Sequence, residues 1–206
     1  MKKDEIVERL LNERLIVIIR SSRQADVGQI VDALVAAGVG ALEVTSNTPG
    51  FTEEIRQAKT KYPNVLVGAG TITRASLAVK ALEAGADFFV TPNVVPEVTP
   101  IAHQAGIPVV MGALTPTEVA QAVASDSDVV KLFPAEIFGI DYMKALMGPF
   151  DKVPFFAVGG IGINEAPNWI AAGAKGIGIG GKLTNLKDGA TSITENARKM
   201  LGLLAV

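Results

Sequence analysis

Lys131 is the first residue whose surroundings indicate chemistry. It lies in the run of residues 128–134, where its closest neighbours along the chain are apolar. A lysine amine inside a buried strand loses its hydration, so its pKa falls and part of it becomes neutral. A neutral amine can attack a ketone carbonyl and form a Schiff base. The alternative is a lysine near a strand end whose ammonium group extends into solvent and takes no part in chemistry.

Glu43 is the second candidate. In residues 41–45 the side chains alternate, so Glu43 lies on the face opposite to Leu42 and Val44. If those two apolar side chains pack against helices, the carboxylate points into the interior, where it needs a partner. Lys131 is the obvious partner, and such a pair suits proton transfer during Schiff-base chemistry. The alternative is an ion pair with a structural role only.

Two pairs of glycines late in the chain are typical of an anion site. Gly159-Gly160 follows one apolar segment and Gly180-Gly181 follows another, and Lys182 adds a positive charge beside the second pair. Glycines let backbone N–H groups approach a phosphate closely. The second segment, Gly178-Ile-Gly-Gly-Lys-Leu-Thr184, has neither the spacing of a dinucleotide-binding loop nor that of a Walker loop. The alternative is that both pairs form tight turns only.

These residues follow segments that read as buried parallel strands. Apolar runs without clean alternation predict strands at 15–20, 41–45, 65–68, 88–91, 108–111, 129–132, 155–158 and 176–179. The segments between them predict helices at 24–37, 52–61, 75–84, 95–105, 116–124, 141–147, 165–171 and about 186–203, with an extra one in front at 3–12. Helix starts are expected at Thr73, Thr115 and Asn164, and Ala-Gly pairs are expected to end four helices.

Eight strands alternating with eight helices in 206 residues predict a compact α/β (β/α)8 TIM barrel with an extra N-terminal helix. An open doubly wound sheet is the alternative. No linker or shift in composition interrupts the chain, so residues 1–206 are expected to form one barrel domain. In such a barrel the chemistry lies at the carboxyl ends of the strands, and this is where Lys131, Glu43 and the glycine pairs fall.

Composition excludes several classes of function. The chain has no Cys and one His, which excludes disulfides, thiol catalysis and metal sites with several histidines. With 19 Lys and Arg against 21 Asp and Glu and no dense basic run, nucleic acid is not an expected partner. No apolar stretch is long enough to span a membrane, and the N-terminus does not resemble a signal peptide. We therefore expect a cytoplasmic protein with no membrane partner.

Four other residues are of types that often take part in catalysis or metal binding, but they are expected to have structural or solvent-exposed roles here. His103 is expected to be a surface or capping residue at a helix end, and Trp169 to pack within a helix. Asp126 and Asp128 flank a turn and are expected to be solvated rather than to bind a metal.

Several motifs, taken together and in order, resemble one family of aldolases. They are Leu42-Glu-Val-Thr45, Val67-Gly-Ala-Gly-Thr71, Thr91-Pro-Asn93, Lys131-Leu-Phe-Pro-Ala-Glu136, Lys144-Ala-Leu-Met-Gly-Pro149, Val158-Gly-Gly160 and Gly178-Ile-Gly-Gly181. The chain is similar in these segments, from about residue 10 to 200, to the 2-keto-3-deoxy-6-phosphogluconate (KDPG) aldolase family. That family includes 4-hydroxy-2-oxoglutarate aldolases and 6-phosphogalactonate aldolases.

The resemblance implies a class I aldolase that needs no metal and no other cofactor, on a compact barrel that usually forms a homotrimer. It makes Lys131 the Schiff-base lysine and Glu43 the general acid and base. It places Arg20 and Thr71 on the pyruvyl carboxylate and Pro92 and Phe133 in the pocket wall. It also puts Gly159, Gly160, Gly180 and Gly181 around the phosphate of a phosphorylated keto-deoxy sugar acid.

Three positions depart from the gluconate-type pattern of the family. Asn47 stands where many members have Arg, Lys182 where many have Ser, and Val158 where many have Thr. Val158 lies beside the phosphate loop and is expected to contact substrate without a polar group. Three segments resemble the galactonate branch: Asn47-Thr-Pro49, Thr91-Pro-Asn93 and Phe156-Ala-Val-Gly-Gly160. Two others resemble the gluconate type: Lys131-Leu-Phe-Pro-Ala-Glu136 and Gly148-Pro149. This mixture leaves the configuration at C4 of the substrate open.

The main hypothesis is cleavage of 2-keto-3-deoxy-6-phosphogluconate to pyruvate and glyceraldehyde 3-phosphate, with 4-hydroxy-2-oxoglutarate as a possible further substrate. The galactonate epimer is the first alternative substrate. An isomerase or epimerase of phosphosugars, which would use Glu43 as a base and Lys131 only as a charge, is an alternative from another class of enzyme. A barrel that senses phosphate without catalysis is a third.

Overall fold

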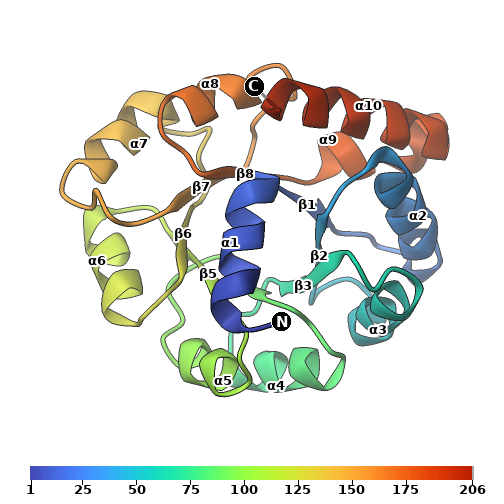
Figure 1. Ribbon diagram of the computed structural model, residues 1–206, viewed down its shortest axis with the longest axis horizontal. Coiled ribbons are helices and arrows are strands. Elements are labelled where there is room, and N and C mark those ends of the chain that lie inside the picture. Colours follow the sequence, from blue (N-terminus) through green and yellow to red (C-terminus); the bar gives the residue numbers. More distant parts are fainter. Residues whose placement is uncertain (206) are drawn as a thin grey trace.

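Eight parallel strands close into a barrel, as the sequence predicts (Figure 1). The computed structural model describes residues 1–205. The strands are β1 Leu15–Ile19, β2 Ala41–Thr45, β3 Leu66–Gly70, β4 Phe89–Val90, β5 Val109–Ala113, β6 Val129–Leu132, β7 Phe155–Val158 and β8 Gly176–Ile179. Each strand pairs with the next in the sequence, and β8 returns to β1. The open sheet is thereby excluded.

The helices form a ring around the strands, apart from α1, which lies in front of the barrel in this view (Figure 1). They are α1 Lys3–Glu13, α2 Val27–Ala37, α3 Phe51–Lys61, α4 Ala75–Glu83, α5 Val98–Gln104, α6 Pro116–Ala124, α7 Gly139–Met147, α8 Ala166–Ala171, α9 Gly181–Thr184 and α10 Gly189–Leu204, with 3-10 turns η1 Gln24–Asp26 and η2 Leu186–Asp188. The sequence predicts no separate α9. This short helix begins at Gly181, within the second glycine pair. The second predicted anion loop therefore leads directly into a helix.

The local signals for helix ends are right in part. Gly38, Gly85, Gly106 and Gly173, the glycines of the four Ala-Gly pairs, all have φ between 74° and 111°, the left-handed region that ends helices. Thr115 caps α6 by accepting from the N–H of Glu118. The expected caps at Thr73 and Asn164 are wrong, because α4 and α8 begin without a side-chain cap.

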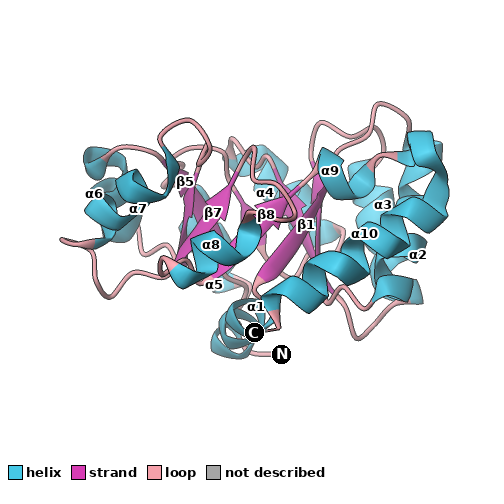
Figure 2. Cartoon of the chain, turned by 90° about the horizontal axis from the view of Figure 1, so that it is seen from above, coloured by secondary structure: helices cyan, strands magenta, loops and turns pink. Residues whose placement is uncertain are grey.

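The two ends of the barrel differ. In Figure 2, α1 and both chain ends lie on one side of the strands, while α9 lies on the other. The α1 side is the amino end of the strands, since α1 leads directly into β1. The carboxyl end carries the loops that follow each strand, which is where barrel enzymes hold their active sites. None of the described helices is long and apolar enough to cross a membrane.

The expectation for Asp128 is wrong. Its side chain is 7% exposed, at the amino end of the barrel. One carboxylate oxygen lies 2.5 Å from Lys3 Nζ of α1, and the other lies 2.8 Å from His103 Nε2 and accepts from the N–H of Val109. His103 therefore pairs with a buried acid instead of capping its helix. Turn-like neighbours in the sequence suggested a solvated aspartate, but the partners come from three distant segments.

Trp169 and Asp126 fit their predictions. Trp169 of α8 is buried in the core. Asp126 is exposed at a turn with φ of 56°.

Candidate active site

A cavity of about 360 Å³ opens at the carboxyl end of the barrel. Every residue to which the sequence analysis gives a substrate or catalytic role lines it: Arg20, Glu43, Thr71, Pro92, Lys131, Phe133, Val158, Gly159, Gly160, Gly180 and Gly181. These residues come from strands and loops spread over most of the chain. The fold therefore brings the predicted set together in one place.

Lys131 stands on β6 inside the barrel. It pairs in register with Gly112 of β5 and Phe156 of β7, and only 6% of the residue is exposed. Burial lowers the pKa of Lys131, the negative charge of Glu43 works against that shift, and the positive charge of Arg20 adds to it. Its Nζ lies 4.9 Å from the centre of the Phe133 ring. The amine does not snorkel to solvent, so more of it is neutral than in an exposed lysine.

Glu43 stands on β2, and 2% of it is exposed. Burial raises the pKa of Glu43, while the charges of Lys131 and Arg20 lower it. A Cβ at Gly70 would overlap the Glu43 carboxylate, so the glycine in the neighbouring strand makes room for this side chain. Among the described residues, no hydrogen bond or direct ion pair satisfies either Glu43 or Lys131. The two groups interact through their charges across the cavity.

Arg20 and Thr71 form the rim on one side of this pair. Arg20 follows β1 directly and is exposed, and its Nη2 donates to Thr71 Oγ1 at 3.4 Å. Thr71 follows β3 directly and has φ of 56°. A guanidinium beside a hydroxyl suits a carboxylate, which accepts charge-assisted hydrogen bonds from both.

The glycine loops follow β7 and β8 and also line the cavity. Gly159 and Gly160 have φ of 100° and 80°, a conformation that side chains other than glycine rarely adopt. Lys182 Nζ donates to the carbonyl oxygen of Gly160 at 2.7 Å and so links the loop after β7 to α9. Gly181 is the first residue of α9, whose leading N–H groups have no acceptor within the helix. The N–H groups at the start of α9 therefore lie close to the positive charge of Lys182.

The charged groups that line the cavity favour a ligand with anionic groups. Arg20 and Lys182 both line it, together with the buried Lys131 and Glu43. A carbonyl placed near the centre would meet an amine and a carboxyl group together.

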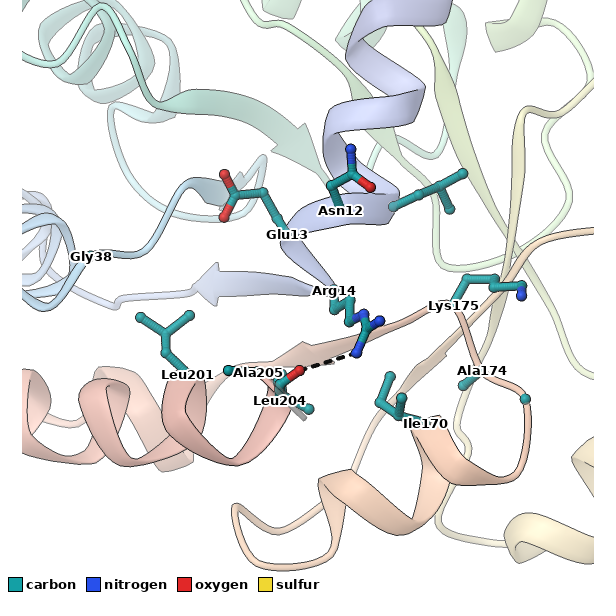
Figure 3. Close-up of a pocket in the computed structure, with 12 residues that line it drawn as sticks. Asn12, Glu13, Arg14, Gly38, Ile170, Ala174, Lys175, Leu201, Leu204 and Ala205 are labelled. Carbon is teal, nitrogen blue, oxygen red and sulfur yellow. Dashed lines mark hydrogen bonds between the residues drawn. The ribbon is translucent and has the colours of Figure 1, made fainter.

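A larger hollow lies at the other end of the barrel (Figure 3). Its volume is about 730 Å³, and it lies between the end of α1, the end of α10 and the loop before β8. Arg14 at its centre donates from Nη1 to the carbonyl oxygen of Leu204 at 3.2 Å, drawn as a dashed line (Figure 3). Glu13 and Lys175 both line it, but among the described residues Glu13 pairs with Arg9 and not with this lysine, so we place the chemistry in the smaller cavity.

Comparison with known proteins identifies the family of the chain. The sequence pattern of KDPG and KHG aldolases matches residues 6–195. The chain belongs to the KDPG and KHG aldolase family. As a member of it, the chain is an aldolase, which is a carbon–carbon lyase. The predicted resemblance is thereby confirmed.

Individual relatives cover most of this aldolase. It is 29% identical over 168 residues to the 2-dehydro-3-deoxy-phosphogluconate aldolase of Haemophilus influenzae, covering 81% of this chain and 79% of the relative. It is 34% identical over 172 residues to the 2-dehydro-3-deoxy-6-phosphogalactonate aldolase of Escherichia coli, covering 82% and 83%. A crystal structure of KDPG aldolase from Legionella pneumophila, with pyruvate captured as a covalent carbinolamine, superposes with a TM-score of 0.83 at 26% identity, covering 91% and 93%.

Sequence reasoning missed part of the cavity wall. Ile18, Ile161, Gly178 and Ile179 also line it. Ile18, Gly178 and Ile179 look like ordinary core strand residues, and Ile161 lies in the loop after β7. No local signal in the sequence distinguishes them from other core residues.

Proposed function

We propose that this aldolase cleaves 2-keto-3-deoxy-6-phosphogluconate to pyruvate and glyceraldehyde 3-phosphate through a Schiff base on Lys131. The observation that carries the proposal is the buried pair in one cavity. The pKa of the Lys131 amine is lowered and the pKa of the Glu43 carboxyl group is raised, each mainly by burial. These shifts favour a nucleophilic amine and a carboxyl group that can both give and take a proton.

In the first half-reaction the neutral Lys131 amine attacks the C2 ketone. The carbinolamine that forms loses water, with Glu43 supplying the proton that the leaving hydroxyl needs. The product is a protonated imine between Nζ and C2. This cationic carbon withdraws electrons, which is why the imine activates the neighbouring C3–C4 bond.

In the second half-reaction Glu43, now a carboxylate, removes the proton of the C4 hydroxyl. The C4–O bond becomes a carbonyl, the C3–C4 bond breaks, and its electrons move to C3 and C2 to form an enamine. Glyceraldehyde 3-phosphate leaves. Glu43 returns the proton to C3, and water then hydrolyses the imine to release pyruvate and the free amine.

Two sets of residues orient the substrate in the cavity. Arg20 and Thr71 hold the carboxylate next to C2, and the loops of Gly159, Gly160, Gly180 and Gly181 hold the phosphate. Lys182 adds a positive charge at the phosphate end. Pro92 and Phe133 form apolar wall beside Lys131, which keeps water away from the amine and supports its lowered pKa.

The galactonate epimer is the second candidate substrate because of Val158. This side chain is buried beside the glycine loop, and it offers no hydrogen bond to the C4 oxygen. An apolar wall discriminates between two placements of a hydroxyl group by only about 10²-fold. We therefore expect both epimers to be cleaved within that factor, and Val158→Thr to shift preference toward the gluconate form.

The test is a steady-state assay of pyruvate release from both epimers, with the unphosphorylated 4-hydroxy-2-oxoglutarate as a third substrate. We expect cleavage of both phosphorylated acids and equal yields of pyruvate and aldehyde. Isomerised or epimerised sugar phosphate without pyruvate would favour the isomerase alternative. A preference above about 10⁴-fold for one epimer would mean that polar groups other than residue 158 set the choice.

We further propose that the chain forms a homotrimer. Ile137 and Phe138, in the segment between β6 and α7, are 68% and 54% exposed. Exposed apolar side chains of this size are typical of contact surfaces. Light scattering should give three times the mass of the chain, and changing both residues to Glu should reduce it. A monomeric wild type would contradict this proposal without affecting the chemistry.

A further inference from the structure

Thr71 has an unusual backbone for its residue type. Its φ of 56° lies in the left-handed region, which β-branched residues avoid because Cβ crowds the neighbouring carbonyl. Such a conformation persists only where surrounding contacts hold it. The fold must therefore contain a group that keeps Thr71 in place.

Ser46 makes those contacts. Its backbone N–H donates to the carbonyl oxygen of Gly70 at 2.8 Å, and its Oγ donates to the carbonyl oxygen of Thr71 at 2.7 Å. These carbonyls belong to the two peptide groups on either side of Thr71. Since φ and ψ of a residue are the rotations of its two flanking peptide groups, one serine fixes both. A further bond, from the N–H of Ile72 to the carbonyl oxygen of Val90 at 3.1 Å, anchors the far side.

The conformation of Thr71 affects the part of the cavity rim that it forms with Arg20. With its backbone held this way, Thr71 directs Oγ1 to Arg20 Nη2. Ser46 follows directly after β2, the strand that carries Glu43. Its neighbour Asn47 is exposed and is not part of the cavity wall. The loop after β2 thus reaches the rim through Ser46.

We propose that Ser46 is a positioning residue that holds Thr71 in its left-handed conformation and so sets the Arg20–Thr71 pair for the substrate carboxylate. This inference rests on the proposed function, since it assigns that pair to the carboxylate. Ser46 does not touch the reacting atoms. Its effect is therefore expected on substrate binding more than on the chemical steps.

The first experiment compares Ser46→Ala with a matched control. Ser125→Ala removes a serine hydroxyl that donates to the carbonyl oxygen of Gln121 at 2.8 Å, at the end of α6 away from the cavity. We expect Ser46→Ala to raise KM roughly 3- to 10-fold, the effect of one hydrogen bond, with kcat nearly unchanged. Ser125→Ala should leave both constants unchanged. Ser46→Thr keeps the hydroxyl, so its KM should be close to that of the wild type.

The second experiment tests whether the effect passes through the backbone of residue 71. Glycine adopts the left-handed conformation freely, so Ser46→Ala should raise KM much less in a Thr71→Gly background than in wild type. Coupling of this kind identifies residues that act through each other. Equal effects in both backgrounds would overturn the proposal, because Ser46 would then act elsewhere.

Reductive trapping of pyruvate with borohydride distinguishes a failure of this inference from a failure of the proposed function. A wild type that gains the pyruvyl adduct, with Ser46→Ala unchanged in KM, overturns this inference alone. So does a Ser46→Ala variant that loses Tm and kcat together at constant KM. A wild type that gains no adduct overturns the proposed function and this inference with it.

Discussion

The two ends of the barrel bury the same kinds of side chain in opposite ways. At the amino end, the Asp128 carboxylate is held by Lys3, His103 and the N–H of Val109, all within 3 Å. At the carboxyl end, Glu43 and Lys131 are as deeply buried, yet no direct hydrogen bond or ion pair joins them in the described chain. A buried charge without a close partner destabilises the fold.

The difference shows that charged side chains stabilise the fold at the amino end and are available for chemistry at the carboxyl end. The amino-end cluster ties α1 to β5 and to α5, so its charges are used to hold segments together. At the carboxyl end the charges remain available to a ligand, and burial shifts the pKa of both groups toward the neutral form. Barrel enzymes in general place stabilising residues at one end and reactive ones at the other.

Replacing the lysine at each end should give the largest contrast. Lys131→Arg keeps a positive charge, but a guanidinium stays protonated and cannot form the imine, so turnover should fall by orders of magnitude. Lys3→Arg keeps the charge beside Asp128, and its turnover should match wild type. The measurement is kcat for both variants, with circular dichroism to show that each is folded. Ordinary turnover by Lys131→Arg would remove this residue from the mechanism.

Replacing the acid at each end should separate activity from stability. Glu43→Gln should slow catalysis by roughly 10²–10⁴-fold, the usual share of general acid–base catalysis, with little loss of stability. Asp128→Asn should lose roughly 1.5–3 kcal/mol of stability, because a buried acceptor loses its charge-assisted bonds. Its activity per folded molecule should remain normal. The comparison of the two ends fails if Glu43→Gln unfolds the protein while Asp128→Asn impairs only kcat.

Adding a side chain at the glycine loop should weaken the binding of phosphorylated substrates more than that of unphosphorylated ones. Gly181 does not have a left-handed backbone, and a Cβ there meets no atom within 4 Å, so Gly181→Val should fold. It should raise KM for the phosphorylated acids roughly 10- to 100-fold, the effect of lost bonds to a charged group. KM for 4-hydroxy-2-oxoglutarate should change much less. Gly202→Val, equally unobstructed in α10, is the control, and equal losses on both substrates would indicate a disrupted loop.

The pH at which pyruvate is trapped should shift in opposite directions when the two charges near Lys131 are removed. The amine must be neutral to react, so trapping falls as pH drops through the lowered pKa of Lys131. Glu43 raises that pKa and Arg20 lowers it. At saturating pyruvate, Glu43→Gln should therefore move the midpoint to lower pH and Arg20→Gln to higher pH. Asp128→Asn should leave it in place, and shifts of the same sign in the first two variants would contradict this electrostatic account.

Much of the carboxyl end could be predicted because strand register follows from sequence. Once residues 41–45 and 129–132 are recognised as buried strands, period-two alternation puts Glu43 and Lys131 in the interior. Closure of the barrel then brings them together. The glycine pairs could be predicted for the same reason, since each ends a strand.

The amino end and the Thr71 rim could not be predicted, because their contacts join distant segments. Lys3 and Asp128 are 125 residues apart, and Ser46 and Thr71 are 25 apart. Nothing in the neighbouring sequence distinguishes Asp128 from a solvated turn residue or Ser46 from an ordinary loop residue. α9 was missed because a helix of four residues has almost no periodic pattern.

The central claim is that the buried lysine at the carboxyl end forms an imine with pyruvate. The direct measurement is to treat the protein with pyruvate and borohydride and map the modified peptide by mass spectrometry. The account predicts one reduced pyruvyl group per chain, on Lys131, and none in Lys131→Arg. An adduct on another lysine, or no adduct in a wild type that still cleaves the phosphorylated acid, would contradict it.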